Sequence, residues 1–162
     1  MLLPAVSYPA GGAIHAVSVT VRWHPVHMPP PYDVYNLLNL LGISVDTDDA
    51  PDRVAGRFTV THPLIAGTGY LWAPVVITLC DALCAFGVSR NWPENAMSFT
   101  TVESKANFVA SAREGEMVVA EAVPLHLGST TQVWDATARN DTSGRVMAAY
   151  RCTQLLLYPR AT

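Results

Sequence analysis

The chain has 162 residues, of which 50 % are hydrophobic and 14 % are charged, and it carries a formal net charge of −3 with a pI near 5.9. This length suits one domain with a substantial core, and the hydrophobic content excludes a chain that is disordered throughout. The ten basic residues are scattered singly, which argues against a nucleic-acid-binding protein because such proteins carry a basic face or stripe.

Residues 1–31 are mildly apolar but are interrupted by prolines and glycines, including three consecutive prolines at 29–31. They lack the basic start of a signal peptide and an unbroken apolar run that could span a membrane. We therefore expect residues 1–31 to be a poorly ordered extension and residues 32–160 to form the domain.

The first predicted element is a short amphipathic helix, with Asp33 as its N-cap and Gly42 just past its end. A strand is predicted over Arg53–Thr61, with Val54, Phe58 and Val60 facing inward. The segment Trp72–Gly87 is apolar on every side and has Pro74 in its first turn, which predicts a buried helix. At about 14 residues, this helix would be too short to cross a bilayer.

The rest of the chain is predicted to be β-structure. Strands are expected over Met97–Phe108, Glu116–Val123, Thr130–Asn140 and Arg145–Tyr158, with short turns between them. Short connections indicate an antiparallel meander. In the first of these strands, alternation places Phe99, Thr101, Glu103, Lys105 and Asn107 on one face.

A helix that is apolar all round needs cover on all sides. A strongly curved antiparallel sheet wrapped around the helix provides it, which predicts an α+β domain with the hot-dog fold. We expect the remaining helix face to meet a second subunit, giving a homodimer or a dimer of dimers.

Asp81 is the one formal charge between Arg57 and Arg90, and it lies on the predicted buried helix. Its helix neighbours at i±3 and i±4 include no cation, so burial would penalise its ionised form unless a partner came from elsewhere. A carboxylate in such a setting suits a general base or nucleophile. The structural alternatives are that Asp81 caps a buried backbone group or faces solvent at the edge of a dimer.

Three cysteines, Cys80, Cys84 and Cys152, form no disulfide framework, which favours reduced thiols and a cytoplasmic protein. Cys80 and Cys84 have i, i+4 spacing, but no second pair completes a metal site, so buried apolar thiols are the favoured interpretation. Neither a metal nor another cofactor is predicted.

From Gly69 to Tyr158 the sequence resembles hot-dog acyl-CoA thioesterases of the phenylacetate-pathway type. The resemblance is carried by the order and spacing of several short stretches: Leu79–Ala82, Thr101–Phe108, Arg113–Gly115, Val119–Ala122, His126–Gly128 and Asp141–Arg145. It implies hydrolysis of an acyl-CoA to a carboxylic acid and CoA.

The resemblance also implies roles for residues at matching positions. Asp81 matches the catalytic carboxylate, and Ala73 matches the residue whose backbone N–H polarises the thioester carbonyl. Thr101 matches a hydroxyl that orients the attacking water. Where the family usually carries His-Gly-Gly, this chain has Trp72-Ala73-Pro74.

The remaining candidates are for substrate binding. They are residues near the helix start, on the strand after the helix, and in turns whose cations or amides suit the phosphates of coenzyme A: Gly69, Trp72, Asn107, Arg113, His126, Gly128 and Ser129.

The altered helix start favours one rival, a non-catalytic hot-dog module that binds acyl-CoA. A hot-dog hydratase is the second rival, but the helix lacks the histidine that this chemistry usually pairs with the acid.

Overall fold

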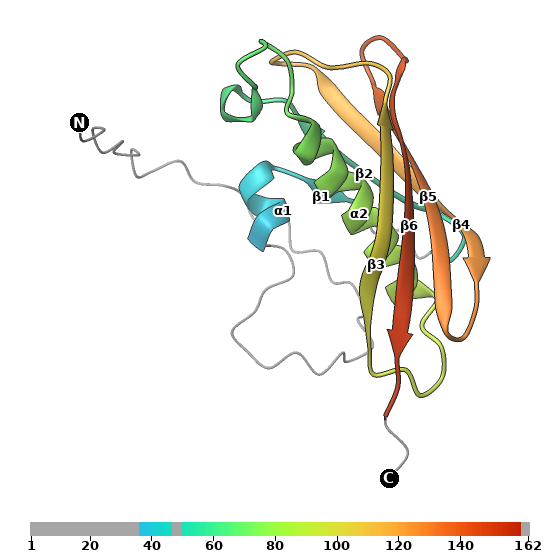
Figure 1. Cartoon of the computed structure of the whole chain (residues 1–162). Helices are drawn as coiled ribbons and strands as arrows, with labels where there is room; N and C mark the ends of the chain where they lie inside the picture. The colour runs from blue at the N-terminus through green and yellow to red at the C-terminus, as the bar shows by residue number, and fades with distance from the viewer. Residues whose placement is uncertain (1–35, 47–49, 160–162) are drawn as a thin grey trace.

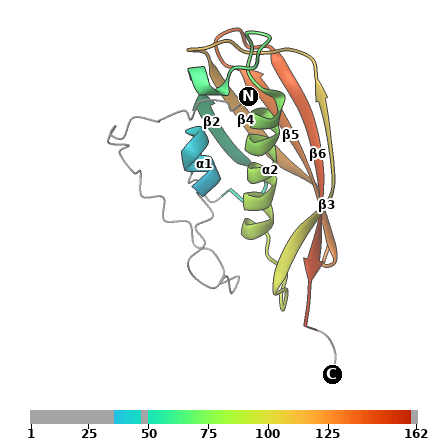
Figure 2. The same ribbon diagram turned by 60° about the vertical axis from the view of Figure 1, so that its left-hand side comes forward.

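The computed structural model describes residues 36–46 and 50–159. The elements in chain order are α1 (Asn36–Leu41), β1 (Ser44–Val45), β2 (Val54–Thr59), η1 (His62–Leu64), α2 (Ala73–Arg90), β3 (Ser98–Phe108), β4 (Met117–Leu127), β5 (Thr131–Asn140) and β6 (Val146–Leu157). The strands form one antiparallel sheet that curves around α2, as Figure 1 and Figure 2 show. The predicted α+β hot-dog fold is confirmed.

The core lies between α2 and the concave face of the sheet. Helix α2 contacts β2, β4, β5 and β6, and α1 packs on it as well. The most buried helix side chains are Leu79, Cys80, Leu83, Cys84 and Val88, all without solvent exposure. Removing these apolar groups from water is the main driving force for the packing.

Helix α2 has 18 residues, so the predicted length of about 14 was wrong. Gly87 does not end the helix, which continues to Arg90; the missing side chain of Gly87 instead leaves room for the indole of Trp134. In the described part of the chain, α2 is the one helix apolar and long enough to cross a membrane, with a mean hydropathy of 1.5. More than half of it is buried inside the domain, as expected for a core helix.

Helix α1 ends as predicted. Gly42 has φ +69°, and the amides of Gly42 and Ile43 donate to the carbonyls of Asn39 and Leu38 at 3.1 and 2.8 Å. This pattern is the Schellman motif, which favours glycine at the left-handed position. The predicted N-cap, Asp33, and the predicted extension over residues 1–31 lie outside the described residues.

The strand order corrects one prediction. Successive strands pair as a meander only from β4 to β6, in the order β1-β2-β4-β5-β6-β3. Strand β3 pairs with β6 instead of β4. The connection from Val109 to Glu116 therefore passes the ends of β6 and β5 before the chain enters β4. Local alternation predicts that a strand exists but carries no information about which strand it pairs with.

A β-bulge in β3 corrects a second prediction. Thr101 pairs with Gln154 and Glu103 with Thr153, which leaves Val102 as an extra residue. Directly opposed residues share a face, so Thr101 faces α2 with the buried Gln154, whereas Glu103 faces outward. The predicted common face for Phe99, Thr101, Glu103, Lys105 and Asn107 is therefore wrong beyond the bulge.

Candidate active site

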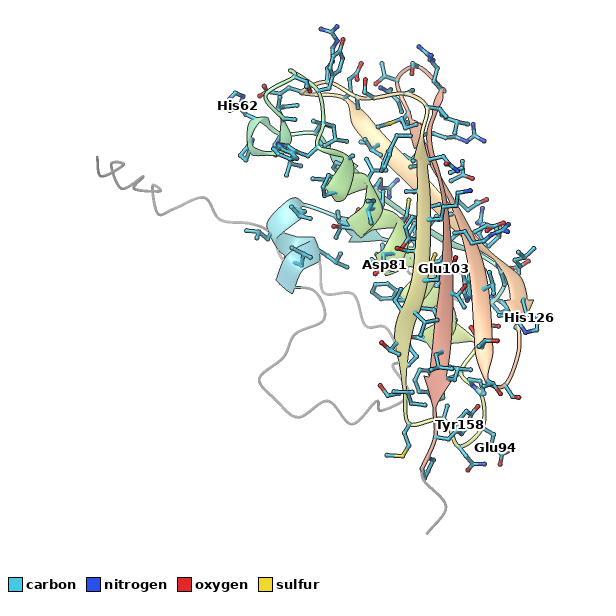
Figure 3. All side chains as sticks on the ribbon, viewed as in Figure 1. His62, Asp81, Glu94, Glu103, His126 and Tyr158 are labelled. Atoms are coloured by element: carbon cyan, nitrogen blue, oxygen red, sulfur yellow. The ribbon has the colours of Figure 1, made fainter. Side chains whose placement is uncertain are left out.

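One side of α2 is not fully covered by the residues that the structure describes. Along this side, the half-buried residues of α2 succeed one another about one turn apart: Ile77, Thr78, Asp81, Ala82 and Ala85. Asp81 is the only charged residue of this stripe. It lies near the middle of α2, at about the height of the centre of β3 in Figure 3.

The Asp81 side chain turns toward β6. Its Oδ1 accepts a hydrogen bond from the Tyr150 hydroxyl at 2.9 Å and lies 3.6 Å from the Cys152 Sγ. Among the described residues, neither a cation nor a donor to Oδ2 contacts Asp81. One carboxylate oxygen is thus anchored by the Tyr150 hydroxyl, and the other has no donor in the described part of the chain.

Two groups near Asp81, the Tyr150 hydroxyl and the Cys80 thiol, keep their protons at physiological pH. Burial, followed by the nearby Asp81 charge, raises the pKa of the Tyr150 hydroxyl well above its ordinary value. The same two causes raise the pKa of the Cys80 thiol to about 12.

The three thiols are free, as predicted. Within residues 36–46 and 50–159, no three His, Cys, Asp or Glu side chains converge as a metal site would require.

The Thr101 hydroxyl and the Asp81 carboxylate approach the same thiol. The Thr101 Oγ1 donates to the Gln154 Oε1 at 3.1 Å and is 4.0 Å from the same Cys152 Sγ that contacts Asp81. The two candidate catalytic oxygens thus lie around one sulfur atom. Asn107 pairs with Ala149 on the outer face and is not brought to this site.

The start of α2 offers one free amide. The N-cap residue, Trp72, donates its backbone N–H to the Leu64 carbonyl at 2.9 Å, and the Val75 N–H donates to the Trp72 carbonyl at 3.1 Å. Pro74 has no backbone N–H. Ala73 is exposed, and its N–H has no acceptor in the described part of the chain. A free amide at the positive end of a helix suits a developing oxyanion.

Ala73 and Asp81 do not meet within one chain. They are separated by eight residues of α2, which places them about 12 Å apart along the helix axis at 1.5 Å per residue. One thioester carbonyl cannot contact both groups at this distance.

Gly69 and Trp72 flank this helix start. Gly69, with φ +81°, closes a tight turn in which its N–H donates to the Ala66 carbonyl at 2.9 Å, next to the bridge between Ile65 and Leu71. The Trp72 side chain is 51 % exposed.

The candidates for coenzyme A binding are split between the two ends of the sheet. Arg113 lies in the connection before β4, where its guanidinium donates to the Tyr70 hydroxyl at 3.0 Å. His126 is the penultimate residue of β4, and Gly128 and Ser129 lie in the hairpin after it. Strand β4 spans about 33 Å at 3.3 Å per residue, so these residues of one chain cannot contact the same phosphate.

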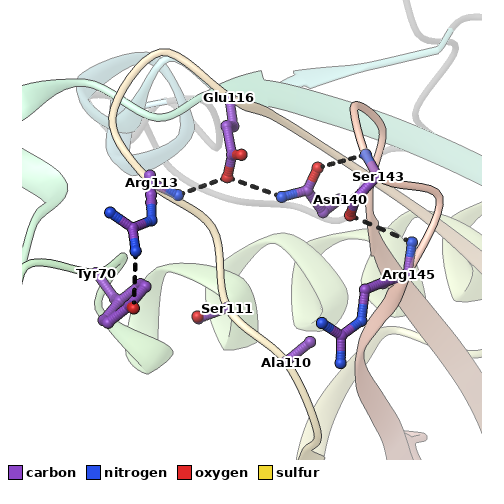
Figure 4. Close-up of a pocket in the computed structure, with 8 residues that line it drawn as sticks. All are labelled: Tyr70, Ala110, Ser111, Arg113, Glu116, Asn140, Ser143 and Arg145. Atoms are coloured by element: carbon purple, nitrogen blue, oxygen red, sulfur yellow. Dashed lines mark hydrogen bonds between the residues drawn. The ribbon is translucent and has the colours of Figure 1, made fainter.

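Arg113 belongs to a pocket of about 440 Å³ between the β3–β4 connection and the β5–β6 turn (Figure 4). It is lined by Tyr70, Ala110, Ser111, Arg113, Glu116, Asn140, Ser143 and Arg145. The Glu116 carboxylate is held by the Arg113 N–H at 2.7 Å and the Asn140 Nδ2 at 2.8 Å. Neither the Arg113 nor the Arg145 guanidinium has a carboxylate partner among the described residues.

Sequence reasoning missed Tyr150 and Gln154, which contact the two candidate catalytic side chains. They come from β6, which was predicted as a strand but not examined for polar groups that face inward. The signal was the i, i+2, i+4 spacing of Tyr150, Cys152 and Gln154, which puts three polar side chains on one face of the strand, between Ala148 and Leu156.

Comparison with known proteins identifies the family of this chain. The sequence model of the thioesterase superfamily matches residues 68–147. A 1,4-dihydroxy-2-naphthoyl-CoA hydrolase of Listeria monocytogenes is 30 % identical over 117 residues, which cover 72 % of this chain and 92 % of the relative.

Solved structures share the fold. A mutant of a thioesterase enzyme from Staphylococcus aureus is 28 % identical with a TM-score of 0.69, over 75 % of this chain and 98 % of that one. The PaaI protein from the phenylacetic acid degradation operon of E. coli superposes with a TM-score of 0.67 at 19 % identity, over 78 % of this chain and 87 % of that one. The chain therefore belongs to the thioesterase superfamily and is a thioester hydrolase with the hot-dog fold.

Proposed function

We propose that the protein hydrolyses acyl-CoA thioesters, with Asp81 as the group that delivers the attacking oxygen. The observation that carries this proposal is the state of the Asp81 side chain: half-buried, without a cation, anchored through Oδ1 and free at Oδ2. Water adds its oxygen to the thioester carbonyl carbon, the C–S bond breaks, and the sulfur leaves as CoA thiol after taking up a proton.

Asp81 can act in either of two ways. As a general base, Oδ2 removes a proton from water while Thr101 holds that water in place. As a nucleophile, Oδ2 attacks the carbonyl directly and forms an anhydride that water then cleaves. Both routes develop negative charge on the carbonyl oxygen, which a main-chain N–H stabilises.

The proposed oxyanion donor is the Ala73 N–H of a second subunit. The separation of about 12 Å along α2 prevents Ala73 and Asp81 of one chain from sharing a carbonyl. Two uncovered surfaces support a homodimer. One is the half-buried stripe of α2, and the other is the free edge of β3, where Val102 is 55 % exposed. A long unpaired edge strand readily pairs with another strand.

We assign the pocket around Arg113 to the phosphates of coenzyme A. Two guanidiniums without carboxylate partners and the Tyr70 hydroxyl suit an anionic ligand.

The proposal also includes a cytoplasmic location, supported by three free thiols, with neither a nucleic acid nor a membrane as partner.

The test is hydrolysis of short, long and aromatic acyl-CoAs by the wild type and by Asp81→Asn. We expect turnover of at least one acyl class and a loss of about 10²–10⁴-fold in kcat for Asp81→Asn, as for removal of a general base. Asp135→Asn is the matched control, because Asp135 is bound to Arg151 at 2.5 Å on the opposite face of the sheet. Equal turnover by wild type and Asp81→Asn would contradict the role of Asp81, and binding without turnover would favour the acyl-CoA-binding module.

A further inference from the structure

Strand β6 presents three polar side chains to α2 beneath Asp81. Tyr150, Cys152 and Gln154 alternate along the strand, so they share the inner face, and none is more than 4 % exposed. Buried polar groups cost free energy unless they are hydrogen-bonded, so their partners reveal what they do.

Tyr150 fixes which oxygen of Asp81 is free. Its hydroxyl donates to Oδ1 at 2.9 Å, and the Cys152 thiol also approaches Oδ1, at 3.6 Å. Burial raises the pKa of Tyr150, so the hydroxyl keeps its proton and remains a donor at neutral pH. A donated hydrogen bond favours the ionised form of a carboxyl group, and Oδ2 is left as an acceptor.

Gln154 fixes the direction of the Thr101 hydroxyl. The Gln154 Nε2 lies 3.0 Å from the Cys152 Sγ, which turns the amide oxygen toward Thr101, and the Thr101 Oγ1 donates to that oxygen at 3.1 Å. A hydroxyl has one hydrogen, so once it donates to Gln154 its oxygen can only accept from other groups.

We propose that Tyr150 and Gln154 are positioning residues that make Asp81 Oδ2 and Thr101 Oγ1 acceptors for the same water. A water that donates one hydrogen to each oxygen keeps a lone pair for the thioester carbonyl. This inference rests on the proposed role of Asp81, and it assigns the orientation of the nucleophile to two residues of β6.

The first test is Tyr150→Phe, which removes the hydroxyl and keeps the ring. We expect kcat to fall about 10- to 100-fold, since a hydrogen bond to a charged group is lost, with KM nearly unchanged. The acidic limb of the pH–rate profile should move upward by about one pH unit, because the ionised carboxylate loses a donor. A purely structural role would lower activity without moving this limb, and that result would overturn the proposal.

The second test is a double-mutant cycle. Gln154→Met should lower kcat about tenfold in the wild-type background but less than about twofold when Thr101→Val is already present, because Gln154 acts through Thr101. The matched control is Gln132→Met: Gln132 is equally buried and pairs with Gln154, but its amide contacts the Asn91 carbonyl and Trp134. Additive effects in the cycle would overturn the role of Gln154.

These outcomes can be told apart from failure of the proposed function. If Asp81→Asn abolishes turnover but Tyr150→Phe and Gln154→Met do not alter kcat, only the positioning inference fails. If Asp81→Asn retains full turnover, the proposed mechanism fails and the inference fails with it.

Discussion

Gly87 shows how one residue sets the distance between α2 and the sheet. A Cβ built at this position would lie 2.5 Å from Cη2 and 2.6 Å from Cζ3 of the Trp134 ring. Trp134 is fully buried at the centre of β5, so neither the ring nor the helix can move aside without opening the core.

Gly87→Ala should therefore destabilise the protein although alanine is the better helix former. Overpacking costs about 1–3 kcal/mol, whereas the gain in helix propensity is at most about 1 kcal/mol. We expect a net loss of about 1–2 kcal/mol in the free energy of unfolding, measured with urea. The control is Gly67→Ala, where a Cβ meets no atom within 4 Å. Equal stability of the two variants would contradict the packing argument.

Asp81 was identified from sequence because it is a lone charge in an apolar run, and its partners were not. Tyr150 and Cys152 are 69 and 71 residues away along the chain. Their proximity depends on how β6 is placed under α2, which no local pattern encodes. The end of α2 was predicted wrongly for a related reason. The glycine at position 87 makes room for the Trp134 ring and does not mark the end of the helix.

At the scale of elements, helices and strands were largely predictable and their pairing was not. Periodicity identified β2, α2, β5 and β6 with small errors at their ends. It could not identify the pairing of β3 with β6, nor the bulge at Val102, because both depend on hydrogen bonds between strands far apart in sequence. Because of the bulge, Thr101 lies on the inner face of the sheet while Asn107 faces outward.

The half-buried stripe of α2 gives an element-scale prediction. Ala85 lies on this stripe, so an arginine at this position can reach solvent in a single chain but would place an unpaired charge in a subunit interface. We expect Ala85→Arg to convert a dimer to a monomer in light scattering and to lower kcat/KM at least tenfold with Asp81 intact.

Ala149→Arg is the matched control, because Ala149 is exposed on the outer face of β6. We expect the Ala149→Arg variant to remain a dimer in light scattering. A dimeric and fully active Ala85→Arg variant would show that the α2 stripe is not the interface.

At the scale of the whole molecule, the proposed site exists only where two chains meet. A half-buried carboxylate in the middle of α2 and a free amide at its start are well placed for one reaction only if they come from different subunits. In a symmetric dimer, each of the two sites would combine Asp81 of one subunit with Ala73 of the other.

Subunit mixing tests this central claim most directly. Asp81→Asn removes the carboxylate, and Ala73→Pro removes the amide hydrogen at a first-turn position that tolerates proline. Each variant alone should be nearly inactive. When the two are unfolded and refolded together in equal amounts, half of the dimers are mixed, and each mixed dimer has one site with both defects and one intact site. The mixture should therefore recover about a quarter of the wild-type turnover of its best acyl-CoA, and a mixture as inactive as its two components would contradict a site shared between subunits.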